Sequence, residues 1–317
     1  MSTIPLTVPP KPSLRSRLAS AWDGDVMWSF RHSPVAVGAF IVLFICLAAA
    51  FAAPLLAPHN PFDLKTLNLQ ESLLPPGWLS GGNAGFLLGT DDQGRDLLSA
   101  IMYGARISLL VGMGSVALAM LLGVSLGLIA GYVGGRLDAF IMRVADVQLS
   151  FPAILIALLI DGVARAVLPR DSHSSVVLPV LILAIGLSNW VQYARTVRGS
   201  TMVEKSKEYV QAARVIGRSS LQIMMRHLLP NVLGPVLVIA TINIASAILT
   251  EAALSFLGVG MPVTEPSLGT LIRVGNDFLF SGEWWITIFP GIALVVMVLS
   301  INLLGDWLRD ALNPRLR

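Results

Sequence analysis

Few residues in this sequence have the types and spacing that chemistry requires. Its four histidines lack the spacing of metal ligands, and its single cysteine, Cys46, lies inside an apolar run. It contains no Gly-x-x-x-x-Gly-Lys-Ser/Thr loop that could hold a nucleotide phosphate. We therefore expect a chain that has no catalytic residue, binds no metal or cofactor, and hydrolyses no ATP by itself.

The composition is that of a membrane protein. Of the 317 residues, 55% are hydrophobic and only 13% are charged, whereas a soluble domain carries about twice that share of charge. The net charge of +3 gives no reason to expect nucleic acid as a partner. The composition predicts an all-α integral membrane protein whose surface largely faces lipid.

Six stretches are long and apolar enough to cross a bilayer, which takes about 20 residues. They cover approximately residues 35–56, 105–130, 139–162, 176–196, 232–257 and 284–306. The third is the weakest, because Arg143 and Asp146 interrupt it. If both ends lie in the cytoplasm, 16 of the 22 Lys and Arg residues lie inside, as the positive-inside rule requires.

These spans divide the chain into parts. The predicted parts are a cytoplasmic tail (1–33), a first transmembrane helix (34–57), an extracytoplasmic loop (58–104), a core of five further transmembrane helices (105–309) and a second cytoplasmic tail (310–317). Within the core, a polar cytoplasmic loop covers residues 197–231.

Polar side chains at membrane depth are costly and often functional. Asn243, Glu251 and Ser255 are therefore candidates to line or gate a path through the membrane. For Glu251 two interpretations stay open: it faces a water-filled path, or it is a structural cap or part of an interface salt bridge.

The second span carries glycines at four-residue spacing, at positions 123, 127 and 131. Such a stripe lets another helix backbone approach closely. We favour ordinary packing over a seam that moves.

The loop 197–231 is the most informative segment. Residues 204–216 have a helical pattern, Gly217 stands where a helix C-cap glycine belongs, and Ser219 or Ser220 can cap a second short helix. That helix should end near Leu228, before Pro230. The result would be a compact knob with a small-residue patch at Ala212-Ala213 for a partner; the alternative is a solvated basic loop attracted to anionic lipid.

The spacing in this loop resembles the signature of bacterial ABC-importer permeases. In this sequence the corresponding residues are Gln211-Ala212-Ala213, then three residues, Gly217, nine residues and His227-Leu228-Leu229-Pro230. Gln211 and His227 stand where the family usually has Glu and Ile. Further stretches, among them Leu88-Gly89-Thr90-Asp91 and Gly94-Arg95-Asp96, are similar to the C permease of the dipeptide/oligopeptide/nickel branch.

This resemblance implies a type I ABC-importer permease fold with about six transmembrane helices and cytoplasmic coupling helices, in a bacterial inner membrane. It implies import of peptides or a related small solute by alternating access, with ATP and magnesium bound by partner subunits. The implied partners are a second homologous permease, two cytoplasmic ATPase subunits and an extracytoplasmic binding protein. The residues expected to dock the ATPase are Glu208, Gln211, Ala212, Ala213, Gly217, Arg218, Leu229 and Pro230.

The alternative function is a secondary transporter or channel that is not coupled to ATP. That class is often built from an inverted repeat, and none is apparent here. The acidic external segment, which includes Asp91, Asp92 and Asp96, is expected to contact the binding protein or cover the channel mouth. A calcium loop is disfavoured by the spacing, and Asp91 is expected to cap the helix that follows.

Overall fold

The structure, a computed structural model, describes residues 25–62, 67–167 and 173–311. Within these ranges the regular secondary structure is helical, apart from one isolated bridge between Thr90 and Asp96. The elements in chain order are α2 (Asp25–His32), α3 (Pro34–Phe51), α4 (Ala53–Leu56), η1 (Leu69–Glu71), α5 (Leu97–Val133), α6 (Gly135–Leu149), α7 (Ala153–Val167), α8 (His173–Glu204), α9 (Glu208–Val215), α10 (Ser220–Ile223), η3 (Met224–Leu228), α11 (Leu229–Phe256), α12 (Leu268–Asn276), η4 (Leu279–Ser281) and α13 (Trp285–Ala311).

The predicted all-α membrane fold is confirmed. Five helices of the described chain are long and apolar enough to cross a membrane, and there are six if the bent pair α6–α7 counts as one span. Helix α3 shows the pattern of a lipid-facing span, because large apolar side chains such as Phe44 and Ile45 are about 60% exposed on it.

The third predicted span is not one straight helix. Helices α6 and α7 meet at an angle of 92°. Pro152 lies at the break, and its ring disfavours helical geometry at Phe151. The continuous span predicted for 139–162 is therefore wrong at its middle.

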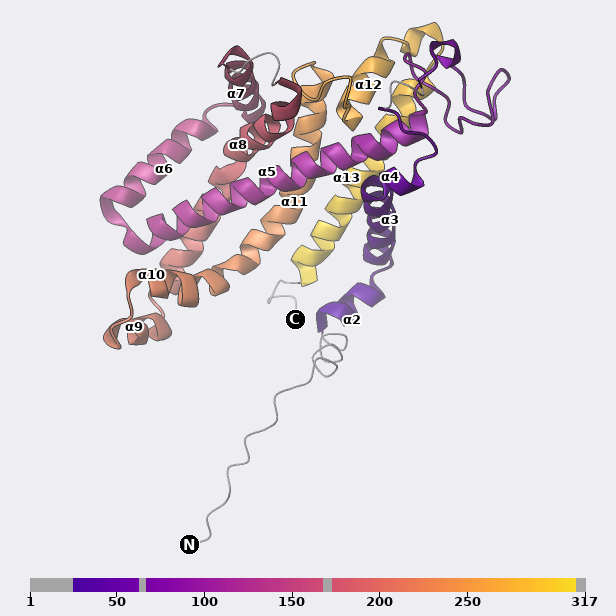
Figure 1. Cartoon of the computed structure of the whole chain (residues 1–317). Helices are drawn as coiled ribbons and strands as arrows, with labels where there is room; N and C mark the ends of the chain where they lie inside the picture. The colour runs from indigo at the N-terminus through magenta and orange to yellow at the C-terminus, as the bar shows by residue number, and fades with distance from the viewer. Residues whose placement is uncertain (1–24, 63–66, 168–172, 312–317) are drawn as a thin grey trace, which may run out of the picture.

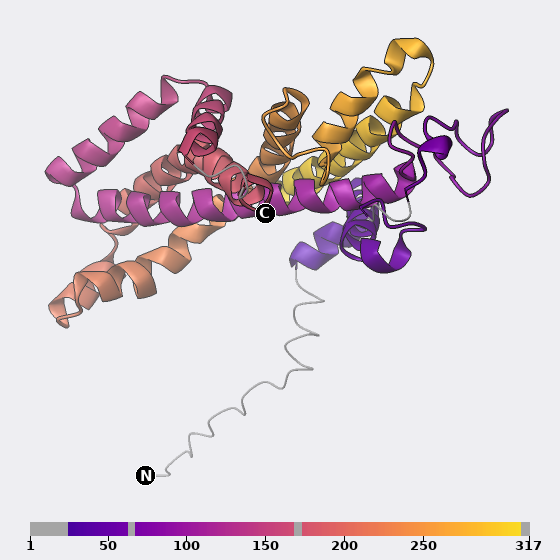
Figure 2. The same ribbon diagram turned by 45° about the horizontal axis from the view of Figure 1, so that its top comes forward.

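The longest helix, α5, runs from the segment 67–96 at one end of the molecule to α6 at the other (Figures 1 and 2). It packs most extensively against α8. A Cβ atom added to Gly127 would lie 2.4 Å from the carbonyl oxygen of Ala194. A Cβ atom added to Gly123 would lie 2.4 Å from the carbonyl oxygen of Trp190. The glycine stripe is therefore the surface of closest helix packing, as expected.

Several predicted boundaries shift. Helix α5 begins at Leu97, within the segment 58–104 that the sequence predicts as an external loop. Asp96, and not Asp91, caps this helix, with its carboxylate 3.0 Å from the backbone nitrogen of Ser99. At the other end of the chain α13 continues to Ala311, two residues beyond the predicted core.

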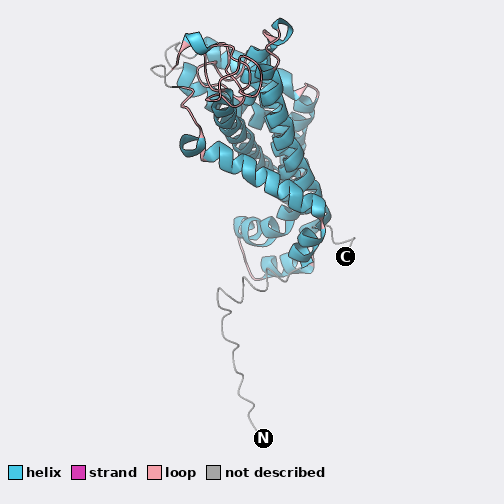
Figure 3. Ribbon diagram, turned by 90° about the vertical axis from the view of Figure 1, so that its right-hand side faces the viewer, coloured by secondary structure: helices cyan, strands magenta, loops and turns pink. Residues whose placement is uncertain are grey.

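The elements gather at two ends of the helix bundle (Figures 1 and 3). Helices α2, α9 and α10 and the end of α13 lie towards one end, while α12 and the segment 67–96 lie at the other. The predicted tail 1–33 includes α2, whereas its first 24 residues and residues 312–317 lie outside the described residues.

Candidate functional site

Residues 208–228 form a projection at one end of the bundle, which we call the knob (Figure 1). Its first helix, α9, ends at Val215, and Gly217 follows the C-cap residue with a φ of +81°, which favours glycine. The backbone N–H of Gly217 donates to Arg214 O at 2.9 Å and that of Arg218 to Ala213 O at 3.1 Å. This pair of bonds is a Schellman motif, so the predicted glycine cap is confirmed.

The second part of the knob is capped as predicted but does not stop as predicted. The Ser219 hydroxyl accepts from the backbone of Gln222, whose side chain returns the bond as a capping box. The helix then continues through the π-helical turn η3 into α11 without a break. A widened turn accommodates Pro230, which has no N–H and clashes with a regular preceding turn.

The knob is anchored to the membrane helices by apolar packing. Val210, Ala213 and Ile223 are at most 6% exposed and belong to one apolar cluster with side chains of α5, α8 and α11. The ammonium of Lys205 donates to Gly131 O at 2.9 Å, which joins the chain before the knob to the end of α5. Movement of the knob must therefore move these helices.

Polar contacts fix the knob further. The hydroxyl of Tyr209 donates to the Glu204 carboxylate at 2.8 Å, and the amide of Asn231 donates to Tyr209 at 3.3 Å. Burial and the bond to Glu204 raise the pKa of Tyr209 to about 12, so the phenol stays protonated at neutral pH. The Arg214 guanidinium lies 5.4 Å from the centre of the Tyr132 ring, a cation–π distance.

The outer side of the knob carries exposed apolar side chains. Their exposed fractions are 88% for Val215, 76% for Ile216, 65% for Leu221 and 54% for Met225. Exposed large apolar side chains gathered on a projecting element favour an interaction site. We call these four residues the apolar face of the knob.

Two of the three path candidates share one buried network. Glu251 is fully buried; Ser108 donates to it at 2.8 Å and Ser255 at 2.6 Å. Its partners in the described chain are hydroxyls, so the bonds here are not the salt bridge considered as an alternative. Asn243 is 6% exposed and lies beside Tyr193.

Two protein-family models match this chain. Residues 123–317 match the model of the family described as "Binding-protein-dependent transport system inner membrane component", and residues 20–76 match "N-terminal TM domain of oligopeptide transport permease C". The chain belongs to this permease family. It is the permease subunit of an ABC importer, a translocation component and not an enzyme, as predicted.

Relatives along nearly the whole chain agree. The chain is 41% identical to the dipeptide transport system permease protein DppC of Escherichia coli, with 91% of each chain covered. It is 39% identical to the di/tripeptide permease DppC of Pseudomonas aeruginosa, again over 91% of each. It is 35% identical to the oligopeptide permease OppC of Bacillus subtilis, covering 94% of this chain and 91% of that one.

A solved structure shows the same fold. The inward-facing MetNI methionine ABC transporter matches with a TM-score of 0.52 and 19% identity, over 68% of this chain and 96% of that chain. The type I importer architecture predicted from the signature loop thus has a structural counterpart. The alternative of a transporter outside the ABC class is set aside.

The predicted docking residues, in the knob and at the start of α11, differ in their exposure. Glu208, Gln211, Ala212, Gly217, Arg218 and Pro230 are exposed. Ala213 is 6% exposed and faces the protein interior, and Leu229 is half-buried. The expectation that Ala213 contributes to a surface patch is therefore wrong, because adjacent helix positions point about 100° apart.

Sequence reasoning missed the apolar face of the knob. The predicted docking residues include none of Val215, Ile216, Leu221 and Met225. A signal was present: Val215 and Ile216 are adjacent apolar residues at a helix end, and one helix face cannot bury both.

The Glu251 network yields a prediction about stability. Glu251→Ala should lower the free energy of unfolding by about 1–3 kcal/mol, because the buried Ser108 and Ser255 hydroxyls lose their acceptor. Thermal unfolding of the purified permease measures this. Thr250→Ala is the matched control, since its exposed hydroxyl bonds only within its own helix; an equal loss in both variants would contradict the network's importance.

Part of the acidic segment that precedes α5 is buried in the protein. Asp91 and Arg95 are 1% and 2% exposed, and the Arg95 Nε lies 2.6 Å from Asp91 Oδ2. Arg95 also donates from Nη1 to the carbonyl oxygen of Val263 at 2.7 Å. We call this set the outer clamp. Asp91 is therefore unavailable to a binding protein in this conformation, contrary to expectation.

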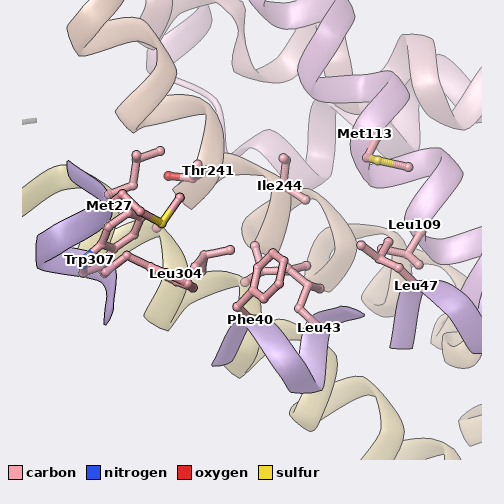
Figure 4. Close-up of a pocket in the computed structure, with 14 residues that line it drawn as sticks. Met27, Phe40, Leu43, Leu47, Leu109, Met113, Thr241, Ile244, Leu304 and Trp307 are labelled. Atoms are coloured by element: carbon pink, nitrogen blue, oxygen red, sulfur yellow. The ribbon is translucent and has the colours of Figure 1, made fainter. Parts of the chain in front are cut away.

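An apolar cavity of about 520 Å³ lies between α2, α3, α5, α11 and α13 (Figure 4). Among the described residues that line it, none is charged. The one hydroxyl, of Thr241, bonds within its own helix at 2.8 Å. The cavity therefore suits apolar chains and not a polar solute.

Proposed function

We propose that this permease imports peptides into the bacterial cytoplasm by alternating access, driven by ATP that partner subunits bind and hydrolyse with magnesium. The support is its 35–41% identity to permeases whose names specify dipeptides, di/tripeptides or oligopeptides. Its proposed partners are a second homologous permease, two cytoplasmic ATPase subunits and an extracytoplasmic binding protein.

The observation that carries the docking proposal is the apolar face of the knob. Val215 and Ile216 are the most exposed apolar side chains of the knob, and they adjoin the exposed Arg218. An apolar centre with an arginine at its rim is typical of a protein interface. An ATPase subunit therefore docks on this face, with Glu208, Gln211, Ala212 and Arg218 around it.

Force passes from this face into the membrane through the knob's buried side. Val210, Ala213 and Ile223 hold the knob against α5, α8 and α11, so the knob and these helices move together. Closure of the two ATPases would shift the equilibrium between inward-facing and outward-facing states, provided that the interface differs between them.

The same arrangement supports an orientation with both termini in the cytoplasm. The knob, α2 and the end of α13 lie towards one end of the bundle (Figure 1). The knob's exposed arginines, Arg214, Arg218 and Arg226, belong to the basic side assigned by the positive-inside rule.

The test is Ile216→Glu in the complete transporter. A carboxylate in the middle of an apolar interface should weaken ATPase association at least about tenfold, or about 1.4 kcal/mol, and should reduce ATP-driven uptake of dialanine accordingly. Copurification of the ATPase subunits and vesicle uptake measure the two effects. Ile216 is 76% exposed, so the substitution leaves the fold intact; a substitution at the buried Ala213 would not separate folding from docking.

The matched control is Phe280→Glu. Phe280 is 96% exposed and lies in η4, towards the opposite end of the bundle from the knob. This variant should copurify with the ATPases as the unmodified permease does. Full ATPase association in the Ile216→Glu transporter would show that the knob is not the docking site.

A further inference from the structure

Helices α6 and α8 are joined by an ion pair whose two side chains are about half exposed. Arg195 Nη2 lies 2.5 Å from Asp146 Oδ1, with a single contact between the two groups. Their side chains are 47% and 53% exposed. Asp146 lies roughly 16 Å along α6 from Gly135, at about 1.5 Å per residue, in the last turn before the bend of the α6–α7 pair, which counts as a sixth span if taken as one.

The ion pair belongs to a polar face shared by the two helices. On each helix the members recur at spacings of three, four and seven, which places them on one side. We call this set the polar face: Arg143 and Asp146 of α6 and Ser150, its C-cap residue, with Ser188, Gln192 and Arg195 of α8. It explains why the third span is weakly apolar in sequence.

The neighbouring side of α6 is different. Phe140, Val144 and Val147 are between 44% and 67% exposed there. Helix α6 therefore presents one apolar and one charged side outside the fold of this chain. The apolar side can meet lipid, whereas exposed charges at this depth require water or a polar neighbour.

A second ion pair between the same helices makes more contacts and is less exposed. Arg198 and Asp138 are joined by two bonds, including Nη2 to Oδ2 at 2.7 Å, and are 32% and 15% exposed. Two-point contact and partial burial make this pair a fastening between α6 and α8. The open pair Asp146–Arg195 has neither feature, so fastening does not account for it.

We propose that the polar face lines the translocation path and that Asp146 and Arg195 are the countercharges for a peptide's amino and carboxyl termini. This inference rests on the proposed import of peptides. Arg195 offers the donor fork that suits a carboxylate, and Asp146 accepts from an ammonium group. In the empty path the two side chains neutralise each other, so no charge is left unpaired.

The path is tested first by thiol accessibility. In a Cys46→Ser background, which removes the chain's single cysteine, Gln192→Cys and Val144→Cys are treated with a charged, water-soluble thiol reagent in the complete transporter. Gln192→Cys should react at least about tenfold faster, because only a hydrated thiol ionises and reacts. Equal reaction rates for the two variants would indicate that Gln192 faces lipid and would overturn the proposal. Protection of Gln192→Cys that is the same in nucleotide-free and ATP-bound transporter would indicate a static permease interface and would also overturn it.

The countercharge role is tested by exchanging the pair. Asp146→Asn and Arg195→Gln should each lower dialanine uptake at least about tenfold while the complex still assembles with its ATPases. The exchange Asp146→Arg with Arg195→Asp restores a pair of opposite charges but reverses their positions. Uptake should remain low in this double variant, whereas recovery to the unmodified rate would show that the pair is only a fastening and would overturn the proposal.

Controls separate this inference from the proposed function. Arg198→Gln should reduce the thermal stability of the complex more than Arg195→Gln does, because it breaks the two-point, partly buried contact with Asp138. If the unmodified complex imports no dialanine or other peptide, peptide import itself is wrong. The thiol rates need no substrate, and they still decide whether the polar face is wet.

Discussion

Replacing Arg95 by methionine should destabilise the permease by about 3–5 kcal/mol, since removal of one partner leaves the other charge buried and unpaired. Asp91 is 1% exposed and would keep its carboxylate without the guanidinium that now lies 2.6 Å away. The variant also loses the bond from Arg95 to Val263 O, which ties the segment 67–96 to the chain before α12. Thermal unfolding in detergent and the yield of folded protein measure the effect.

A surface ion pair provides the control. Lys207 lies 2.6 Å from Glu204 but is 52% exposed. Lys207→Met should change stability by only about 0–1 kcal/mol, because solvent screens an exposed pair. Equal losses for Arg95→Met and Lys207→Met would show that burial of the outer clamp contributes nothing.

Gly127→Ala should separate α5 from α8. The added Cβ would lie 2.4 Å from the carbonyl oxygen and 3.0 Å from the Cα of Ala194. Both are backbone atoms, which cannot turn aside as a side chain does, so one helix must shift. Overpacking of this kind costs about 1–3 kcal/mol, and loss of the α5–α8 contact should also reduce assembly of the transporter.

Gly199→Ala is the comparison for this variant. Gly199 lies within α8, and nothing is found within 4 Å of its added Cβ. Alanine should be neutral there or stabilising by about 0.4–1 kcal/mol, because it restricts the unfolded chain. If Gly127→Ala were equally harmless in unfolding and assembly assays, the glycine stripe would not be the close contact that the structure describes.

Local features of the functional site were predictable because they depend on neighbouring residues. The cap at Gly217 follows from one residue's freedom at positive φ, and the cap at Ser219 from a bond to Gln222 three positions away. The end of the second knob helix was mispredicted at Pro230. A proline disfavours a regular turn before it, but packing of Leu228 in the core sustains a widened turn that the local rule does not foresee.

Which side of a helix is buried was harder to predict from the sequence. Ala212 and Ala213 are identical in sequence terms, yet one is exposed and the other is packed against the membrane helices. The choice depends on how α9 is rotated against α5, α8 and α11. The missed apolar face of the knob has the same cause.

By itself, the sequence determined that this protein is helical, lies in a membrane and carries the signature loop of an ABC-importer permease, because apolar runs and turn residues act over short stretches of chain. Only the tertiary structure decided which polar residues are buried and which are open. Glu251 meets Ser108 from 143 positions earlier, and Asp146 meets Arg195 across two helices. Such contacts depend on the packing of distant helices, and no local pattern encodes them.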